Sequence, residues 1–516
     1  MTVSESGAAS TTTVHKKAPA HPQRKVADKG SHNKVSSGRT SPANRSPRIS
    51  DSSLTIFHRH SPKAPLMPFL LEAWVKPSVR RPLPDVKPAP VAAPGPRSQH
   101  PPSYLGWIRL AILGFALLAL RDALDSIVTH GWLTPMYLFT NFARDLVNIP
   151  GLLASPSVQI LFSFNLFVLA GWLIQRTAHS IYEKTGRLHT GLFFTLRALL
   201  SCSCLAFTTW AMVNWDTNIC FNAVNIIIMA SHSAKLWSYG AVNDGLRLAA
   251  KMAETDPTNT KYSQIVADKL NNYPKNLTLG DAFYFSLAPT LCYQPIFPRT
   301  QSINWSFVAL RFVEFLFFCA LEVFLALQLM QPALQGSIVA FEQGDYLALA
   351  ARILHIMVPN MLIWLVGFYA YFHVFLNMTS ELLRFSDRQF FSDWWNATTV
   401  AYFWRSWNGP VHNFIVAHVY LPLQESGAAS RVLAGLLSFI ISALAHEALA
   451  VVPLGLIGKA PPYAMLAMLA QPLAVVATAR MKKTLLGSLF FWSTLIIGQP
   501  AVVFLYFIAH TKAYSA

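Results

Sequence analysis

Residues 431–456 read RVLAGLLSFIISALAHEALAVVPLGL, and this stretch decides the class of fold. It is long enough to cross a bilayer, because a helix rises about 1.5 Å per residue and the hydrocarbon core is about 30 Å thick. Between Val432 and Leu456 the only strongly polar side chains are those of His446 and Glu447. Backbone groups in lipid must be satisfied within the segment, so we expect a membrane-spanning helix that carries two ionisable groups.

Apolar runs of similar length recur along the chain after Pro102. They predict an all-α, polytopic membrane protein with about nine spanning helices. The predicted spans are residues 105–128, 158–175, 191–213, 219–237, 305–330, 353–377, 431–456, 463–479 and 485–509. The first is the weakest, because Arg109, Arg121, Asp122 and Asp125 interrupt it.

Composition agrees with a membrane protein. Of the 516 residues 53% are hydrophobic and only 13% are charged, whereas an ordinary soluble chain is about 25% charged. The net charge of +17 suggests a nucleic-acid partner until it is located: residues 1–100 hold 16 Lys and Arg against 5 Asp and Glu. We therefore expect no nucleic-acid partner. Residues 1–102, rich in Ser, Pro, Lys and Arg, are predicted to be a mostly disordered cytosolic tail, and residues 103–516 a membrane-embedded domain.

Loop charges predict the orientation. With the tail in the cytosol, the short cytosolic loops carry Arg176, Lys184, Arg187, Arg480, Lys482 and Lys483, and the luminal loops carry only Arg144 and Lys459. This asymmetry follows the positive-inside rule and predicts a cytosolic N-terminus and a luminal C-terminus. Residues 238–304 and 378–430 are too long for simple connectors and fall on the cytosolic side. The second, rich in aromatic residues, is predicted to lie at the membrane interface as amphipathic helices.

The pair His446-Glu447 needs an explanation because it lies deep in its span. The stretch from Val432 to His446 corresponds to about 21 Å of helix, where an ionisable group costs a few kcal/mol. Ser438, Ser442 and His446 are spaced i, i+4, i+8 and share one face. Histidine accepts a proton near neutral pH, so His446 is a candidate general base. The alternative is a structural histidine satisfied by a neighbouring helix, and the adjacent Glu447 favours function.

Five Arg, Glu and His residues lie within the spans 305–330 and 353–377; some of them are expected to form structural ion pairs that line the bundle interior, and none is assigned a catalytic role. These residues are Arg311, Glu314, Glu322, His355 and His373. The five cysteines lack metal-ligand spacing, and no His, Asp and Glu cluster has it, so we predict no metal site.

A second feature is Phe-Phe-x-Asp-Trp-Trp-Asn at residues 390–396, followed by the aromatic run 402–412. Composition alone favours an interfacial aromatic helix with Asp393 as its cap. The string resembles the Phe-Tyr-x-Asp-Trp-Trp-Asn signature of the sterol and diacylglycerol acyltransferases, a branch of the membrane-bound O-acyltransferase family. Phe391 replaces the tyrosine, a change that is tolerated if the ring only packs. His446-Glu447 resembles the catalytic histidine of this family and the residue after it.

Further stretches resemble the diacylglycerol-acylating members. They are Lys235-Leu-Trp-Ser-Tyr239, Tyr273-Pro-Lys-Asn-Leu-Thr278, Ala288-Pro-Thr-Leu-Cys-Tyr-Gln294, Phe297-Pro-Arg299, His446-Glu-x-x-x-x-Val-Pro453 and Leu495-Ile-Ile-Gly-Gln-Pro500. The resemblance covers roughly residues 103–510. The sterol-acylating enzymes share the Asp-Trp-Trp-Asn core but not the Val-Pro that follows the histidine.

This resemblance implies transfer of an acyl group from acyl-CoA to the free hydroxyl of 1,2-diacylglycerol in the endoplasmic reticulum membrane. It implies that His446 is the general base and that Asn396 or Gln499 stabilises the oxyanion. Glu447 and Ser442 would tune or orient the site. No serine or cysteine has a nucleophile's setting, so we expect direct transfer without an acyl-enzyme. No cofactor is implied, because acyl-CoA is a substrate.

The resemblance also implies a set of substrate-binding residues. They are Phe390, Phe391, Asp393, Trp394, Trp395, Tyr402, Trp404, Trp407, His412 and Ser442. The CoA phosphates need basic groups, for which Arg405, His412 and His418 are nearby candidates; the family tends to carry more Lys and Arg here. Family members form dimers or tetramers, and the apolar island at residues 66–74 motivates the same expectation for this chain.

Two alternatives stay open from the sequence. Sterol or fatty-alcohol acylation uses the same mechanism on another acceptor. A polytopic transporter could use His446 and Glu447 as a proton relay, although nothing in the sequence resembles inverted repeats with broken helices.

Overall fold

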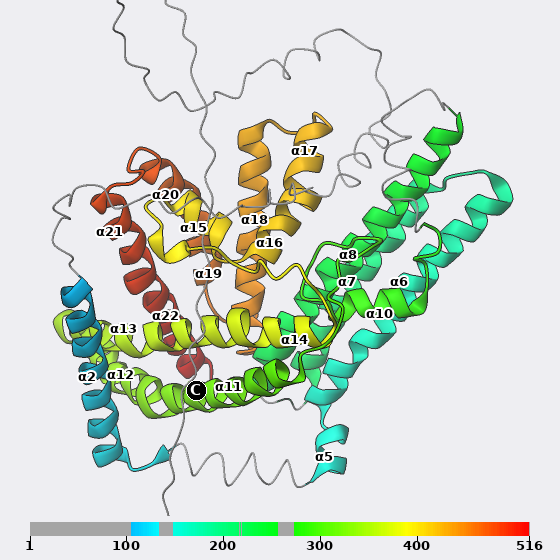
Figure 1. Cartoon of the computed structure of the whole chain (residues 1–516). Helices are drawn as coiled ribbons and strands as arrows, with labels where there is room; N and C mark the ends of the chain where they lie inside the picture. The colour runs from blue at the N-terminus through cyan, green and yellow to red at the C-terminus, as the bar shows by residue number, and fades with distance from the viewer. Residues whose placement is uncertain (1–104, 134–147, 216, 218, 256–272, 515–516) are drawn as a thin grey trace, which may run out of the picture. The chain divides into compact units, whose positions relative to one another are not determined.

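The computed structural model describes residues 105–133, 148–215, 217, 219–255 and 273–514 (Figure 1). The predicted tail and its apolar island at residues 66–74 lie outside these residues. Every regular element within the described ranges is a helix. The all-α fold expected from the long apolar runs is therefore confirmed.

Six helices are long and apolar enough to cross a membrane, judged by length and composition among the described residues. They are α6 (Pro156–Thr185), α7 (Thr190–Asn214), the continuous α11–η4–α12 (Trp305–Glu342), α13–η5–α14 (Tyr346–Leu382), α18 (Arg431–Val451) and α21–η8–α22 (Leu485–Tyr514). Their flanks expose large apolar side chains, for example Leu166, Phe317 and Leu485. Such contiguous exposure fits a lipid environment rather than water. The protein is a multi-pass membrane protein.

The three other predicted spans are also helical but differ in form. Helix α2 (Leu105–His130) covers the first, and α8 (Ile219–Thr255) extends well beyond the predicted end at residue 237. The predicted span 463–479 is divided into α19 (Tyr463–Leu469) and α20 (Gln471–Thr478). Pro472 lies in the first turn of α20, and proline cannot donate the backbone hydrogen bond that would continue α19.

Widened π-helical turns interrupt several of the long helices. Three of them, η4 (Leu325–Met330), η7 (Val416–Tyr420) and η8 (Thr494–Gly498), end two residues before a proline. These prolines are Pro332, Pro422 and Pro500. A proline lacks an N–H and its ring presses on the preceding turn, so a wider turn lets the chain remain helical through it. The last of these turns places Gln499 at the start of α22 (Gln499–Tyr514).

Helices α6, α7 and α8 pack together and hold a buried polar network against α10 (Leu279–Leu287) (Figure 1). The Lys235 ammonium donates to the carbonyl oxygens of Phe285, Ser286 and Ala288 at 3.1, 2.6 and 2.6 Å. These are carbonyls at the end of α10 that the helix itself leaves unpaired. Lys235 therefore supplies the C-terminal cap of α10 from another helix.

The same network connects segments far apart in sequence. The Ser238 hydroxyl accepts from the backbone N–H of Tyr293 and bonds His418 Nε2, each at 2.8 Å. The Asn276 amide donates to Asn243 Oδ1 at 3.0 Å and to the Tyr293 hydroxyl at 2.8 Å. The stretches 235–239, 273–278 and 288–294, noted above for their resemblance, thus meet in one buried cluster whose contacts are structural.

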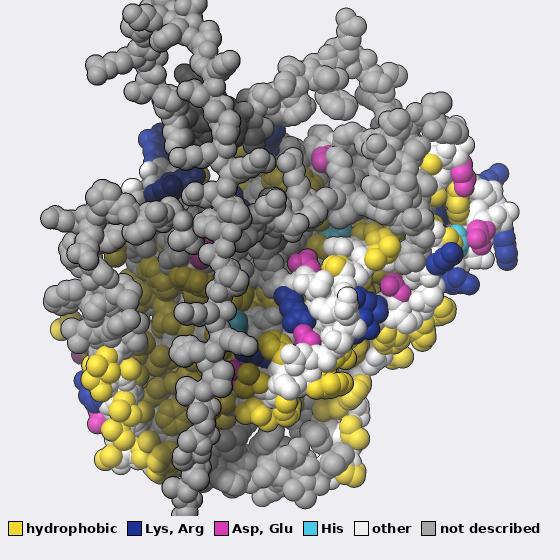
Figure 2. Space-filling model, viewed as in Figure 1, with side chains coloured by type: hydrophobic (Ala, Val, Ile, Leu, Met, Phe, Trp, Pro, Cys, Tyr) yellow, Lys and Arg dark blue, Asp and Glu magenta, His cyan; other side chains and the backbone are white. Residues whose placement is uncertain are grey.

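The visible surface separates apolar from charged side chains. Apolar side chains cover the flanks of the helices on the face in Figure 2, while charged side chains gather at helix ends and over the segment that follows α14 (Leu376–Leu382). Broad apolar surface on the helix flanks is what a membrane-embedded domain requires.

Candidate active site

Helix α18 carries the predicted catalytic histidine. The Ser430 hydroxyl caps its first turn by accepting from the Leu433 N–H at 3.2 Å. The apolar residues that follow, with no glycine or proline near the end, keep the helix regular to Val451. His446 thus lies more than halfway along a helix built for a membrane, and its ring is half-buried.

The ring of His446 is held by one nitrogen only. Nδ1 lies 2.7 Å from the backbone carbonyl oxygen of Ser442 and 3.4 Å from the Ser442 hydroxyl. A carbonyl oxygen can only accept, so Nδ1 carries the proton in the neutral ring and Nε2 carries the lone pair. No described residue hydrogen-bonds Nε2. This is the tautomer that a general base needs, with the basic nitrogen left open.

The aromatic segment predicted to form the site does lie against His446. The indole of Trp404 meets the imidazole edge to face, with ring centroids 6.3 Å apart and planes at 89°. Its Nε1–H points to Gln471 Oε1 at 3.4 Å, which links α15 (Val400–Ser406) to the start of α20. The structure therefore brings together two motifs that are more than forty residues apart in the chain.

Around Trp404 the aromatic side chains form a packed cluster. Trp394 is only 2% exposed and packs edge to face against Trp364 and Phe368 of α13. Among the tryptophans of this segment, Trp395 alone is largely exposed. The rings of this segment are covered by α13 and α21 (Leu485–Ser493). The interfacial position of residues 378–430 stays a prediction. The indole N–H of Trp394 is buried with no acceptor among the described residues.

Three more predicted substrate-binding residues support this cluster. Phe390 is buried beside Phe372, and Trp407 stacks on Phe403 with planes at 11°. Phe391 contacts the rings of Phe368 and Trp395. Its ring packs among other rings, which explains how phenylalanine serves where the family signature has tyrosine.

Asp393 organises the polar edge of the segment. Its carboxylate accepts hydrogen bonds from the Tyr402 hydroxyl and, at 3.3 Å, from the Asn396 amide. These two donors hold the pKa of Asp393 below its ordinary value, and the carboxylate in turn raises the pKa of Tyr402. Asp393 therefore stays ionised and orients Asn396, rather than capping a helix as composition suggested.

Gln499 lies directly after the π-helical turn η8, and its half-buried side chain has no hydrogen-bond partner among the described residues. Neither Gln499 nor Asn396 hydrogen-bonds His446. Both amides thus remain able to donate to a substrate, which is what an oxyanion contact requires.

The side chain of Glu447 bonds residues of other helices and not the adjacent His446. Its Oε2 accepts from the Tyr506 hydroxyl at 2.7 Å and from the backbone N–H of Met465 at 3.0 Å. The Tyr506 hydroxyl also accepts from the Ala464 N–H at 2.9 Å. We call Glu447, Tyr506 and these two amides the Glu447 clamp. It ties the histidine helix α18 to α19 and α22, so Glu447 has a positioning role in the structure.

Sequence reasoning missed two residues of this region, Gln471 and Tyr506. Gln471 follows the break between α19 and α20, and nothing in the sequence marked that break as functional. Tyr506 lies seven residues after Gln499, on the same face of α22. That spacing was the one available signal for it.

The three residues predicted to contact the CoA phosphates differ in their exposure. Arg405 is exposed at the end of α15 and His412 is half-buried in α16 (Gly409–Ile415), so both remain candidates. His418 is 5% exposed and bonded to Ser238, and burial lowers its pKa to about 3. A neutral, enclosed imidazole is a poor phosphate contact, so His418 belongs to the buried network instead.

Two expectations concern groups outside this cluster. Arg311 and Glu314 form the expected ion pair within α11 (Trp305–Phe324), at 2.7 Å. Within the described part of the chain, no three His, Cys, Asp or Glu side chains gather as they would around a metal ion.

The fold and this site define a class: a multi-pass helical membrane protein that carries, inside a spanning helix, a histidine with one ring nitrogen free of any described partner. Comparison with known proteins names the family. The sequence profile of the membrane-bound O-acyltransferase family matches residues 255–508. The chain belongs to this family and is an acyltransferase.

Several relatives share most of the chain. It is 33% identical to diacylglycerol O-acyltransferase 1 of Homo sapiens over 410 residues, which covers 78% of this chain and 80% of that protein. It is 30% identical to diacylglycerol O-acyltransferase 1C of Glycine max, covering 78% and 75%. With diacylglycerol O-acyltransferase 1 of Dictyostelium discoideum it shares 32% identity over 68% of this chain, which spans 55% of that longer relative.

Proposed function

We propose that this protein transfers a fatty acyl group from acyl-CoA to the free hydroxyl of 1,2-diacylglycerol, giving triacylglycerol and CoA. The observation that carries the proposal is the imidazole of His446, which is hydrogen-bonded through one of its two ring nitrogens. Its Nδ1–H is committed to the Ser442 carbonyl, and Nε2 is left open beside Trp404. The relatives that match most of the chain carry the name of this activity.

The reaction follows from that geometry. As the diacylglycerol hydroxyl oxygen attacks the thioester carbon, its proton passes to His446 Nε2. The carbonyl oxygen becomes an oxyanion, to which the Asn396 or Gln499 amide donates a hydrogen bond. When the intermediate collapses, the C–S bond breaks and the CoA sulfur leaves with the proton from the imidazole. No covalent acyl-enzyme and no cofactor enter this sequence.

The apolar surroundings suit both substrates. The half-buried rings of Trp404 and Trp407 offer apolar surface for an acyl chain, and Arg405 and His412 are the basic groups of this segment for a polyanionic CoA.

The test is acyl transfer by membranes from a triacylglycerol-deficient host that expresses the full chain. Labelled oleoyl-CoA is supplied with 1,2-diacylglycerol, a sterol or a long-chain alcohol in parallel. We expect label in triacylglycerol from the wild type and not from His446→Ala. Sterol ester or wax ester without triacylglycerol would reject the acceptor but keep the mechanism; transfer that survives His446→Ala would reject the base.

We also propose that the enzyme resides in the endoplasmic reticulum membrane as a homodimer or homotetramer, with a cytosolic N-terminus and a luminal C-terminus. The loop charges and the family resemblance support this. Glycosylation acceptors added at each end test the orientation, and only the C-terminal one is expected to be modified. Light scattering in detergent, with and without residues 1–100, tests the assembly; a monomeric full chain contradicts it.

A further inference from the structure

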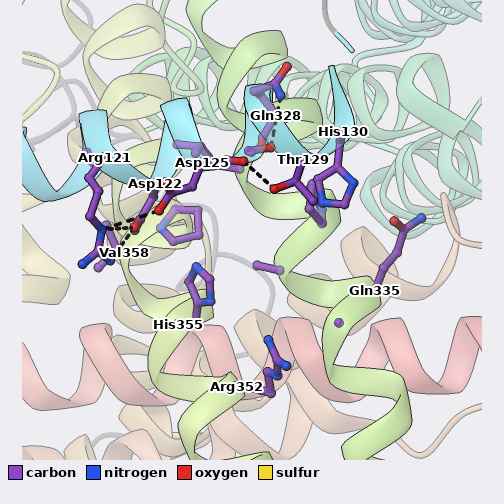
Figure 3. A pocket seen from close by; sticks show the side chains of 17 residues that line it. Arg121, Asp122, Asp125, Thr129, His130, Gln328, Gln335, Arg352, His355 and Val358 are labelled. Carbon is purple, nitrogen blue, oxygen red and sulfur yellow. Dashed lines mark hydrogen bonds and ion pairs between the residues drawn. The ribbon is translucent and has the colours of Figure 1, made fainter. Parts of the chain in front are cut away.

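A cavity of about 390 Å³ lies between α2, α12 (Gln331–Glu342) and α13 (Tyr346–Phe368) (Figure 3). Its size is within the range of small-molecule sites. None of the residues assigned above to acyl transfer lines it. Its walls combine apolar side chains such as Leu329 and Val358 with charged ones, which points to an amphiphilic occupant rather than to the packed interior of a bundle.

One wall carries a positive charge, that of Arg352, beside an imidazole. Arg352 and His355 lie three residues apart on the same face of α13, and Figure 3 shows both side chains pointing into the space between the helices. Neither side chain makes a hydrogen bond or ion pair with any described residue. The Arg352 guanidinium lies over Gly336, where an added Cβ would be 3.5 Å from its Nη1.

Arg352 is exposed and has no counter-ion among the described residues. Arg352 lies about 9 Å of helix from the start of α13, a helix that is apolar enough to span the membrane. A charge inside a spanning helix persists when it reaches water or meets a partner. Because Arg352 is aimed across the cavity toward α2, an anionic partner in the cavity accounts for its direction.

The facing wall carries charges of both signs, with two carboxylates, one arginine and His130 (Figure 3). Asp122 and Asp125 of α2 line the cavity together with Arg121. Arg121 lies 2.6 Å from Asp122 but 4.0 Å from Asp125, whose side chain is 77% exposed. Arg121 thus compensates Asp122 and leaves the charge of Asp125 largely free to meet a cation.

We propose that this cavity binds the headgroup of a zwitterionic bilayer phospholipid. The phosphate lies against Arg352 and His355, and the ammonium end lies toward Asp125. Arg352 on one wall and Asp125 on the other fit such a headgroup and disfavour a purely anionic one, which would meet Asp125 with like charge.

The surroundings identify the bilayer as the source of the ligand. On α2, Leu117, Leu120 and Leu124 are all more than half exposed beside the cavity, so acyl chains find an apolar surface next to the headgroup. Helix α2 is joined to the turn η4 by the Gln328 amide, which donates to the Ser126 hydroxyl at 3.1 Å and to the Gly131 carbonyl at 3.0 Å. The lipid fills the remaining space between α2 and α13.

The experiment counts lipids retained by the purified full chain. The protein in mild detergent is equilibrated with an equimolar mixture of dioleoyl-phosphatidylcholine and dioleoyl-phosphatidylglycerol, and native mass spectrometry measures which one remains bound. We expect the wild type to retain phosphatidylcholine preferentially. Arg352→Gln should reduce that retention about fivefold, and Asp125→Asn should shift the preference toward phosphatidylglycerol.

Matched variants separate the site from general charge effects. Arg187→Gln and Glu342→Gln each remove an exposed charge outside the cavity and should retain lipid as the wild type does. Arg352→Lys keeps the positive charge and should keep the phosphatidylcholine, which also covers the case that Arg352→Gln fails to fold. Excess glycerophosphocholine, which has the headgroup without acyl chains, should not displace the lipid. Displacement would contradict the proposal that the ligand is a bilayer phospholipid. Equal retention of both lipids, or unchanged retention in Arg352→Gln and Asp125→Asn, overturns the site.

Discussion

Lys235 and His446 both place an ionisable group among apolar helices, yet their surroundings differ in one respect. The Lys235 ammonium has three hydrogens and donates to three carbonyl oxygens of the α10 end. His446 has one ring nitrogen bound to the Ser442 carbonyl and the other open. A buried polar group whose donors and acceptors are all hydrogen-bonded stabilises the fold. A group with one donor or acceptor left unbonded can bind or react with a substrate. Five predictions test this contrast.

The largest effect is expected from the open group. His446→Ala should lower kcat by about 10²–10⁴-fold, because general-base catalysis contributes that much. The midpoint of thermal unfolding in detergent should fall only modestly, since the ring's hydrogen bonds lie within its own helix and the variant otherwise loses the ring contact with Trp404. The matched control is His510→Ala on α22, which removes a histidine that contacts Tyr514 and should leave kcat unchanged. A His446 variant that unfolds early would show that the ring is structural.

Replacing Lys235, whose three hydrogens are all donated, should lower the stability of the fold rather than the catalytic rate. Lys235→Met leaves buried carbonyls without donors, each worth about 1–3 kcal/mol, so the unfolding midpoint should fall strongly. The kcat of the enzyme that remains folded should change less than about twofold. Lys251→Met on the same helix removes one exposed bond, to the Gly186 carbonyl at 2.8 Å, and should be nearly silent. Loss of kcat without loss of stability in Lys235→Met would move this lysine into the site.

The Glu447 clamp lies between these extremes. Tyr506→Phe keeps the ring beside Tyr463 but removes the hydroxyl that joins Glu447 to α22 and accepts from the Ala464 N–H, leaving Glu447 only the Met465 N–H. We expect kcat to fall about tenfold with KM unchanged, because the base is displaced while binding surfaces remain.

Two further variants sharpen the test of the clamp. Glu447→Gln combined with Tyr506→Phe should cost little more than either change alone, as members of one network do. Tyr514→Phe removes another α22 hydroxyl, one bonded to the Gly455 carbonyl at 3.0 Å, and serves as control. Fully additive losses would separate the two residues.

A smaller effect concerns pH and the buried network. Burial raises the pKa of Asp281 to about 6, against its ordinary value of 3.8. The folded carboxyl therefore binds a proton more tightly than the unfolded one. Its contribution to the free energy of unfolding is greatest below pH 4 and is lost as the pH rises toward 6. Asp281→Asn should flatten the dependence of the unfolding midpoint on pH between 4 and 6; parallel curves for both proteins would contradict the shift.

The smallest effect is expected at the one departure from the family signature. Phe391→Tyr restores a hydroxyl on a half-buried ring whose contacts are with Phe368 and Trp395. Activity should stay within about twofold, as is usual for a change that removes no packing. A large gain would assign the missing hydroxyl a part in catalysis.

Much of the site was readable because it is local. The spacing of Ser442 and His446 on one helix predicts their contact, and that contact is present. The aromatic string predicts rings beside the histidine, and Trp404 lies there. Glu447 shows the limit: adjacency in sequence suggested a partnership with His446, but neighbouring side chains on a helix point about 100° apart. Only the packing of α19 and α22 gave Glu447 its partners.

The sequence by itself determined that this chain is helical and spans a membrane, because length and apolar composition decide how a backbone can exist in lipid. It also marked His446 as a group that needs a reason to be there. The tertiary structure alone decided that His418 is enclosed, that most of the tryptophans pack against α13 and α21, and that a cavity with charges of both signs lies beside α2. Those properties depend on which helices pack against one another. Contacts between residues far apart in the chain produce no periodic pattern in the sequence.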